Sequence, residues 1–81
     1  MAEFNLGLAQ CRARERAEGA SNEYIRYFKK NNINRLETPD NPLVKNFKEL
    51  WKMDYAIDDC QNENDIQKVL DRIKYLRELI K

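Results

Sequence analysis

The sequence predicts an all-α fold, a small helical bundle built on a C-terminal antiparallel helical hairpin with one or two N-terminal helices. The chain has 81 residues with only two Gly and two Pro, and such a composition favours long helices over a sheet with many turns. Apolar residues also recur at helical spacing in the second half of the chain. A chain of this length forms one domain, which divides into an N-terminal helical segment and loop (1–38) and the hairpin (39–81).

The N-terminal part predicts a helix followed by a break. Residues 3–18 are expected to be helical, with three apolar residues on one side: Phe4, Leu8 and Cys11. Gly19 suits a helix end, and the polar residues after it can cap a second short helix over residues 23–30. The alternative is one continuous helix containing Gly19, at a cost of about 1 kcal/mol relative to Ala.

Residues 31–41 are rich in Asn and predict a loop, which two apolar residues are expected to tether to the core: Ile33 and Leu36. A helix is then predicted over residues 42–60, because Asn41 can cap it and Pro42 suits the first helical position. The apolar face of this helix is broad. One side carries Leu43, Phe47, Leu50, Met53 and Ile57, and Val44, Trp51 and Tyr55 widen it to about half of the circumference.

The last segment carries the most regular helical pattern. Asn64 can cap it, and Gln67 three residues later completes a capping box. Its core stripe consists of Ile66, Val69, Leu70, Ile73, Leu76 and Ile80. The short connection over residues 61–64 predicts that the last two helices fold back on each other as a hairpin.

The face of residues 42–60 is wider than one helix can cover. Either the N-terminal segment or another chain must pack on it, and the sequence leaves open which. Because the core is small, association of the chain with another protein or with a second copy of itself is an expected source of stability. The predicted partner-binding residues combine this face with a Tyr and Arg patch on the last helix: Phe47, Trp51, Tyr55, Arg72, Tyr75 and Leu79. The competing interpretation assigns them to the core or to ordinary exposed positions.

Composition argues against several classes of function. With 15 basic and 14 acidic residues the net charge is +1, which gives no global field to attract DNA or an anionic membrane. The chain lacks His, the commonest general base and metal ligand, so we expect no enzymatic activity, no metal and no cofactor. No stretch approaches the ~20 apolar residues of a membrane-spanning helix, and the start lacks a signal-peptide pattern. A cytoplasmic, reducing location is therefore expected, in the host cell if the protein is viral.

The two cysteines, Cys11 and Cys60, are too few for a disulfide framework and make a poor zinc site. Cys11 is expected to fill the helical core. Cys60 ends a helix and is expected to be partly exposed. No base accompanies it, as a nucleophile requires.

Two basic groups raise the alternative of nucleic-acid or nucleotide binding. The first contains Arg14 and Arg16, which point about 160° apart on a helix, and Arg14 has the spacing of an ion pair with Glu18. The second interleaves aromatic rings, which can stack on bases, with cations that can meet phosphates; it consists of Tyr24, Arg26, Tyr27, Lys29, Lys30 and Arg35. We favour the competing interpretation, in which Tyr24 anchors a solvated helix, because the net charge is nearly neutral.

Asp54 and Asp58 lie one helical turn apart inside the broad apolar arc. Paired carboxylates can act as acid and base, or hold a divalent metal together with further ligands. The plainer interpretation is a charge at a helix seam, answered by Lys74 or by an N-terminal arginine. A buried acid without such a partner would be costly.

The residues therefore predict a non-enzymatic protein–protein interaction module, an adaptor, regulator or inhibitor that also self-associates. The alternative is a nucleic-acid or nucleotide-binding protein that uses residues 24–35. An origin in a phage or mobile element, with a host protein as the target, is a further expectation that rests only on small size and missing catalytic groups.

Overall fold

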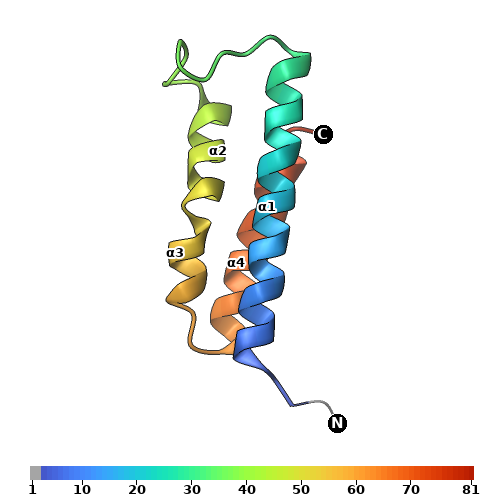
Figure 1. The fold of residues 1–81 in the computed structure, drawn as a ribbon, viewed down its shortest axis with the longest axis vertical. Helices are drawn as coiled ribbons and strands as arrows, with labels where there is room; N and C mark the ends of the chain where they lie inside the picture. The colour runs from blue at the N-terminus through green and yellow to red at the C-terminus, as the bar shows by residue number, and fades with distance from the viewer. Residues whose placement is uncertain (1–2) are drawn as a thin grey trace.

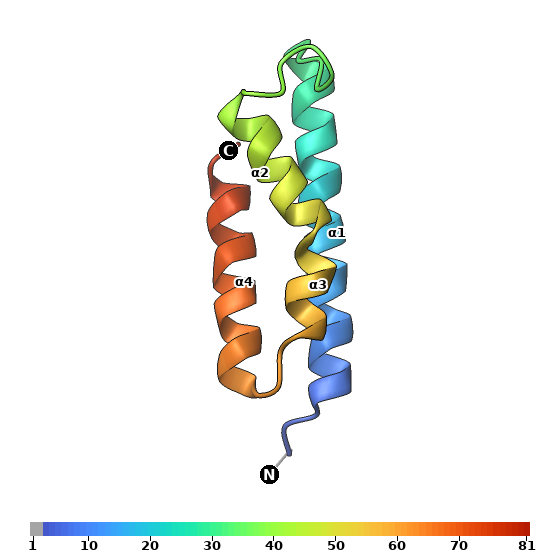
Figure 2. The same ribbon diagram turned by 90° about the vertical axis from the view of Figure 1, so that its left-hand side faces the viewer.

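Four helices build the computed structural model, which describes residues 3–81 and contains no strand within them. They are α1 (Leu6–Lys30), α2 (Pro42–Trp51), α3 (Met53–Asp58) and α4 (Glu63–Glu78). Helix α1 runs the length of the molecule, α2 and α3 return in the opposite direction, and α4 runs parallel to α1 (Figure 1 and Figure 2). The predicted all-α fold with a C-terminal antiparallel hairpin is confirmed.

Helix α1 is continuous, so the predicted break after Gly19 is wrong and the alternative of a single helix is right. Asn5 caps its start, where the side-chain Oδ1 accepts a hydrogen bond from the N–H of Leu8 at 3.0 Å. The hydroxyl of Ser21 donates to the carbonyl oxygen of Ala17 at 2.9 Å, which satisfies this polar side chain inside the helix. Buried residues on both sides of Gly19 outweigh its intrinsic cost of about 1 kcal/mol.

The buried face of α1 consists of Ala13, Ala17, Ala20, Tyr24 and Phe28. The predicted apolar side is wrong, because Phe4 and Leu8 are 44% and 50% exposed and Cys11 is exposed as well. A search for large apolar residues misses a face whose first half is alanine. These small side chains let the neighbouring helices pack close to the backbone of α1.

The end of α1 is closed by backbone hydrogen bonds around Asn32, whose φ of 55° lies in the left-handed region. The N–H of Ile33 donates to the carbonyl of Phe28 at 2.9 Å, and Ile33 packs against the core. Ile33 therefore tethers the loop as predicted. Leu36 does not, because it is 92% exposed.

The predicted helix over residues 42–60 is divided into α2 and α3 at Lys52, whose ψ of 0° leaves the helical range. Asn41 and Pro42 begin α2 as predicted, and the Asn41 side chain accepts from the N–H of Leu43 at 2.8 Å. No Gly or Pro accompanies the interruption. Both helices still bury one face: Val44, Phe47, Leu50, Met53 and Ile57.

Helix α4 begins at Glu63, and Asn62 rather than Asn64 caps it. The Oδ1 of Asn62 accepts from the N–H of Asp65 at 2.9 Å, so the predicted Asn64–Gln67 capping box is wrong. The predicted core stripe is confirmed. Ile66, Ile73 and Leu76 are buried, and Val69, Leu70 and Ile80 pack against the core as half-buried residues.

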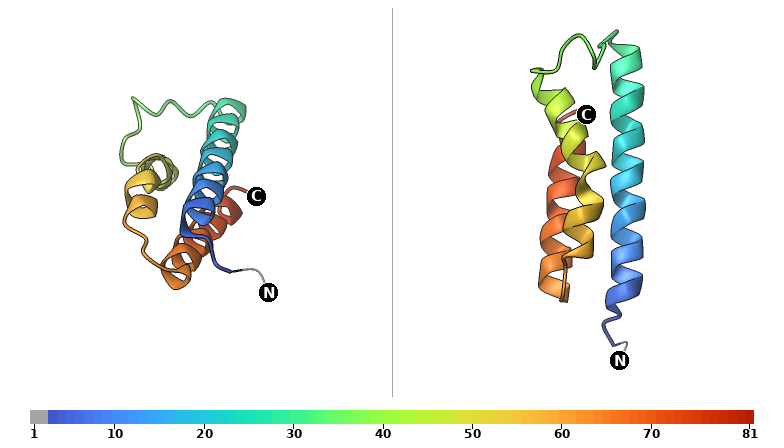
Figure 3. Two further views of the ribbon diagram at one scale, coloured as in Figure 1. Left: turned by 60° about the horizontal axis from the view of Figure 1, so that its bottom comes forward. Right: turned by 60° about the vertical axis from the view of Figure 1, so that its left-hand side comes forward.

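The N-terminal helix packs on the hairpin of its own chain, which the sequence had left open. Figure 3 shows α1, α4 and the α2–α3 pair as three adjacent rods. Phe28 and Phe47 join α1 to α2, with ring centroids 5.8 Å apart. The buried hydroxyl of Tyr24 joins α1 to α4 by donating to the carbonyl oxygen of Leu76. No helix within residues 3–81 is both long and apolar enough to cross a bilayer.

Candidate protein-binding groove

A surface groove of about 750 Å³ lies between α1 and the α2–α3 pair. Its apolar lining comes from Ala17, Ile25, Phe47, Leu50, Trp51 and Tyr55. No residue of α4 lines it, and α4 passes behind α1 in the view of Figure 1. The groove is thus formed by two roughly antiparallel helical walls.

Trp51 and Tyr55 are the prominent features of the α2–α3 wall, with 75% and 76% of their surfaces exposed. They lie four residues apart across the interruption at Lys52. Burial of a large aromatic side chain yields about 2 kcal/mol or more. This gain remains unused at both positions, because both rings face solvent.

Phe47 has a different environment from the other predicted partner-binding residues. It is 9% exposed, packs against Phe28, and lies beneath the Arg35 guanidinium, whose carbon is 4.7 Å from the ring centroid. Phe47 therefore forms the floor of the groove and part of the core. The aromatic surface open to a partner comes from Trp51 and Tyr55.

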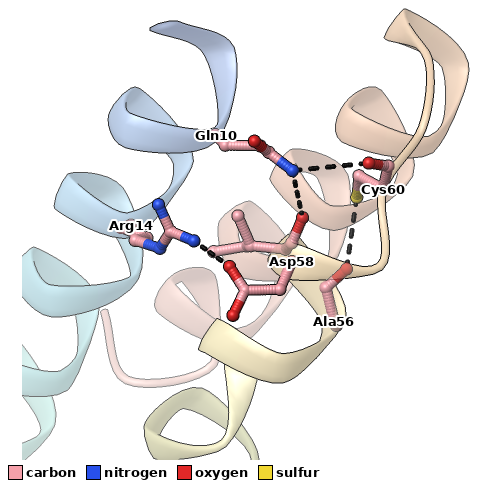
Figure 4. A network of polar contacts seen from close by, with 6 residues as sticks. Gln10, Arg14, Ala56, Asp58 and Cys60 are labelled. Atoms are coloured by element: carbon pink, nitrogen blue, oxygen red, sulfur yellow. Dashed lines mark hydrogen bonds and ion pairs between the residues drawn. The ribbon is translucent and has the colours of Figure 1, made fainter. Parts of the chain in front are cut away.

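An ion pair between Arg14 of α1 and Asp58 of α3 lines the groove near the end of α3 (Figure 4). The prediction that an N-terminal arginine answers one of the paired carboxylates is confirmed. Arg14 pairs with Asp58 and not with Glu18, the helical neighbour suggested by spacing. Nearby, the Gln10 side-chain amide donates to the carbonyl oxygens of Ile57 and Cys60 at 3.1 and 3.4 Å, which ties the end of α3 to α1.

Two further carboxylates lie along the groove, Glu18 on α1 and Asp54 on α3. Both are exposed. Among residues 3–81, no cationic group forms an ion pair with either. Because Arg14 and Asp58 neutralise each other, these two acids leave the groove with an excess of negative charge.

The predicted binding residues on α4 and at its C-terminal end form a separate surface. The guanidinium of Arg72 donates to both carboxylate oxygens of Glu49 on α2, at 2.6 and 2.9 Å, and stands 5.2 Å from the Tyr75 ring centroid. This pairing lowers the pKa of Glu49 and raises that of Arg72. Glu49 and Trp51 differ by about 200° around α2. The patch of Arg72, Tyr75 and Leu79 therefore lies on the other side of α2 from the groove.

The basic and aromatic segment predicted as an alternative nucleic-acid site is not one surface. Tyr24 is fully buried, and burial raises the pKa of its hydroxyl, so it is not available to stack on a base. Tyr27 is half-buried, and Arg35 covers Phe47. Within this segment, the exposed cations on α1 are Arg26, Lys29 and Lys30.

The two cysteines exchange their expected places. Cys60 is buried, its thiol donates to the carbonyl oxygen of Ala56 at 3.3 Å, and burial raises its pKa. Cys11, the expected core residue, is exposed. Cys11 is exposed because alanines form the first half of the buried face of α1, and Cys11 does not lie on that face. Among residues 3–81, no three His, Cys, Asp or Glu side chains gather as a metal site.

Comparison with protein-family models, curated proteins and solved structures finds no match to this chain.

Proposed function

We propose that this protein is a non-enzymatic protein–protein interaction module whose binding site is the groove between α1 and the α2–α3 pair. The observation that carries the proposal is the exposure of Trp51 and Tyr55, each about three-quarters open to solvent beside a formed groove. Aromatic side chains next to a pocket are the residues that most often dominate the binding energy of an interface. An adaptor, a regulator or an inhibitor would use such a site.

The internal packing supports a site that is ready to bind. The groove floor is held by Phe47 and Leu50, which are both buried. Its end is fixed by the Arg14–Asp58 pair and by Gln10. A binding surface held in place by core contacts loses little conformational entropy when a partner docks.

The test is a capture experiment from extracts of the source organism, with the intact chain as bait. The double substitution Trp51→Ala and Tyr55→Ala removes the exposed rings without touching the core. Leu36→Ala is the matched control, because Leu36 is 92% exposed in the loop away from the groove. We expect a protein that is captured by the wild type and the control to be lost with the double variant. Equal capture by all three baits would contradict the proposal.

We also propose that the chain self-associates, which would add apolar contacts to a small core. The α4 patch is the available second surface, because Tyr75 and Leu79 are 51% and 44% exposed. Sedimentation equilibrium over a wide concentration range measures the mass directly. We expect a mass above that of one chain, reduced by Tyr75→Ala. A single-chain mass at every concentration would exclude self-association.

A further inference from the structure

Charge distinguishes the groove from the rest of the molecule. Its charged lining residues are one base and three acids: Arg14, Glu18, Asp54 and Asp58. The ion pair of Arg14 with Asp58 leaves Glu18 and Asp54, a local formal charge of −2 in a chain whose net charge is +1. The two acids come from opposite walls, since Glu18 belongs to α1 and Asp54 to α3.

The dimensions of the groove match a short helix. Its lining on α1 extends from Arg14 to Ile25, a rise of about 16 Å at 1.5 Å per residue. Two helical walls present ridges and a furrow into which a further helix can pack its side chains. The apolar floor then requires apolar residues on one face of that helix, and the acids at the edges require basic residues beside them.

We propose that the groove binds an amphipathic helix of about three turns from a partner protein, with apolar anchors against Trp51 and Tyr55 and Lys or Arg residues facing Glu18 and Asp54. This inference rests on the proposed function and specifies the chemistry of the partner. The bound helix would contact α1 and the α2–α3 pair, because no residue of α4 lines the groove.

The chain carries its own reporter for this site, since Trp51 is its single Trp. The probes are two designed 16-residue helical peptides without aromatic residues. Both carry Leu at helical spacing on one face, and they differ only in having Lys or Glu on the flanks. We expect the Lys peptide to shift Trp51 emission to shorter wavelength and to bind at least tenfold more tightly than the Glu peptide, with the difference reduced by salt.

The net charge of the chain makes this comparison stringent. A chain of net charge +1 attracts the Glu peptide more than the Lys peptide if only overall charge matters. A preference for Lys must therefore come from a local acidic surface, and two matched variants test whether that surface is the groove. The double variant Glu18→Gln and Asp54→Asn is expected to lose the preference. Glu37→Gln with Asp40→Asn, which removes the same charges from the exposed loop, is expected to keep it.

Each other result overturns the inference. Equal binding of both peptides would remove the charge selection while leaving a groove that binds proteins. Loss of the preference in the loop variant would assign the preference to acids outside the groove. A shift of Trp51 emission on concentrating the protein alone, with a rise in sedimenting mass, would identify a second copy as the occupant. No shift with either peptide would exclude a helical ligand, whereas the proposed function is judged by the capture experiment.

Discussion

Single residues decide how α1 is built and which of its faces is buried. Gly19 is tolerated in mid-helix because packing on both sides holds the backbone, and a Cβ added there has no neighbouring atom within 4 Å. Cys11 and Cys60 occupy positions opposite to those expected from the sequence. A substitution at Gly19 tests the continuity of α1, and labelling of the two thiols tests the burial of Cys60.

Gly19→Ala is expected to stabilise the fold by about 1 kcal/mol, because Ala has the higher helix propensity and meets no steric obstacle. Urea denaturation followed by circular dichroism measures the change. Gly7→Ala is the matched control. It is expected to gain less, since Gly7 lies in the first turn of α1, where ends fray. A destabilised Gly19→Ala variant would contradict the continuous helix.

The thiols are expected to differ in reactivity toward iodoacetamide. Cys11 is exposed, whereas Cys60 is buried and its pKa is raised by burial, which reduces the reactive thiolate. Mass spectrometry should find one adduct, at Cys11, on the native protein and two adducts in urea. Rapid labelling of both thiols without denaturant would contradict the burial of Cys60.

At the scale of elements, the sequence predicted the helices whose large apolar residues carry the pattern. The α4 stripe is an example, because each of its members is large and meets the core. The buried face of α1 was missed because alanines form its first half. The division of α2 from α3 at Lys52 has no local signal, since neither Gly nor Pro is present.

The same limit applies to the candidate groove. Exposed Trp51 and Tyr55 follow from the excess width of an apolar face, which the sequence displays. The sequence does not show which cation pairs with Asp58, because folding brings Arg14 to it from a distant segment. For the same reason the sequence did not separate the α4 patch of Tyr75 from the groove residues.

The contact between α1 and α4 gives a prediction at this scale. Tyr24→Phe removes the donor to the carbonyl oxygen of Leu76 in a buried place, and the loss is expected to be about 1–2 kcal/mol. Tyr27→Phe is the control, because Tyr27 is half-buried and its hydroxyl makes no hydrogen bond within the described residues. Thermal or urea unfolding measures both. Equal losses would show that the Tyr24 hydrogen bond contributes no stability.

At the scale of the whole molecule, two Glu–Arg pairs link α4 to the other helices. Arg72 binds Glu49 of α2, and Arg77 binds Glu23 of α1 at 2.5 and 2.9 Å. Both pairs are partly exposed, so each contributes at most about 1 kcal/mol. Their shared effect is a dependence of stability on pH.

Hydrogen bonding to arginine lowers the pKa of Glu23 and of Glu49 in the folded state. The unfolded chain therefore takes up protons first on acidification, and its greater proton uptake favours unfolding. The stabilisation is complete above the ordinary glutamate pKa of about 4.3 and is lost as the pH falls through the lowered folded values. Urea unfolding between pH 7 and pH 3 should show this decline. The double variant Glu23→Gln and Glu49→Gln should lose less stability over the same pH range. An unchanged pH dependence would show that the two pairs do not cause the decline.

The interruption at Lys52 makes α3 a short, separately held unit. Six residues are far too few to stay helical alone, so α3 depends on Gln10, Arg14 and the burial of Met53. Local opening of this segment should therefore occur while the three longer helices persist, and its amide protons should exchange with deuterium sooner than those in the centre of α1. Each such event would displace the wall that carries Tyr55, so a partner that binds the closed groove should slow the exchange of these amides.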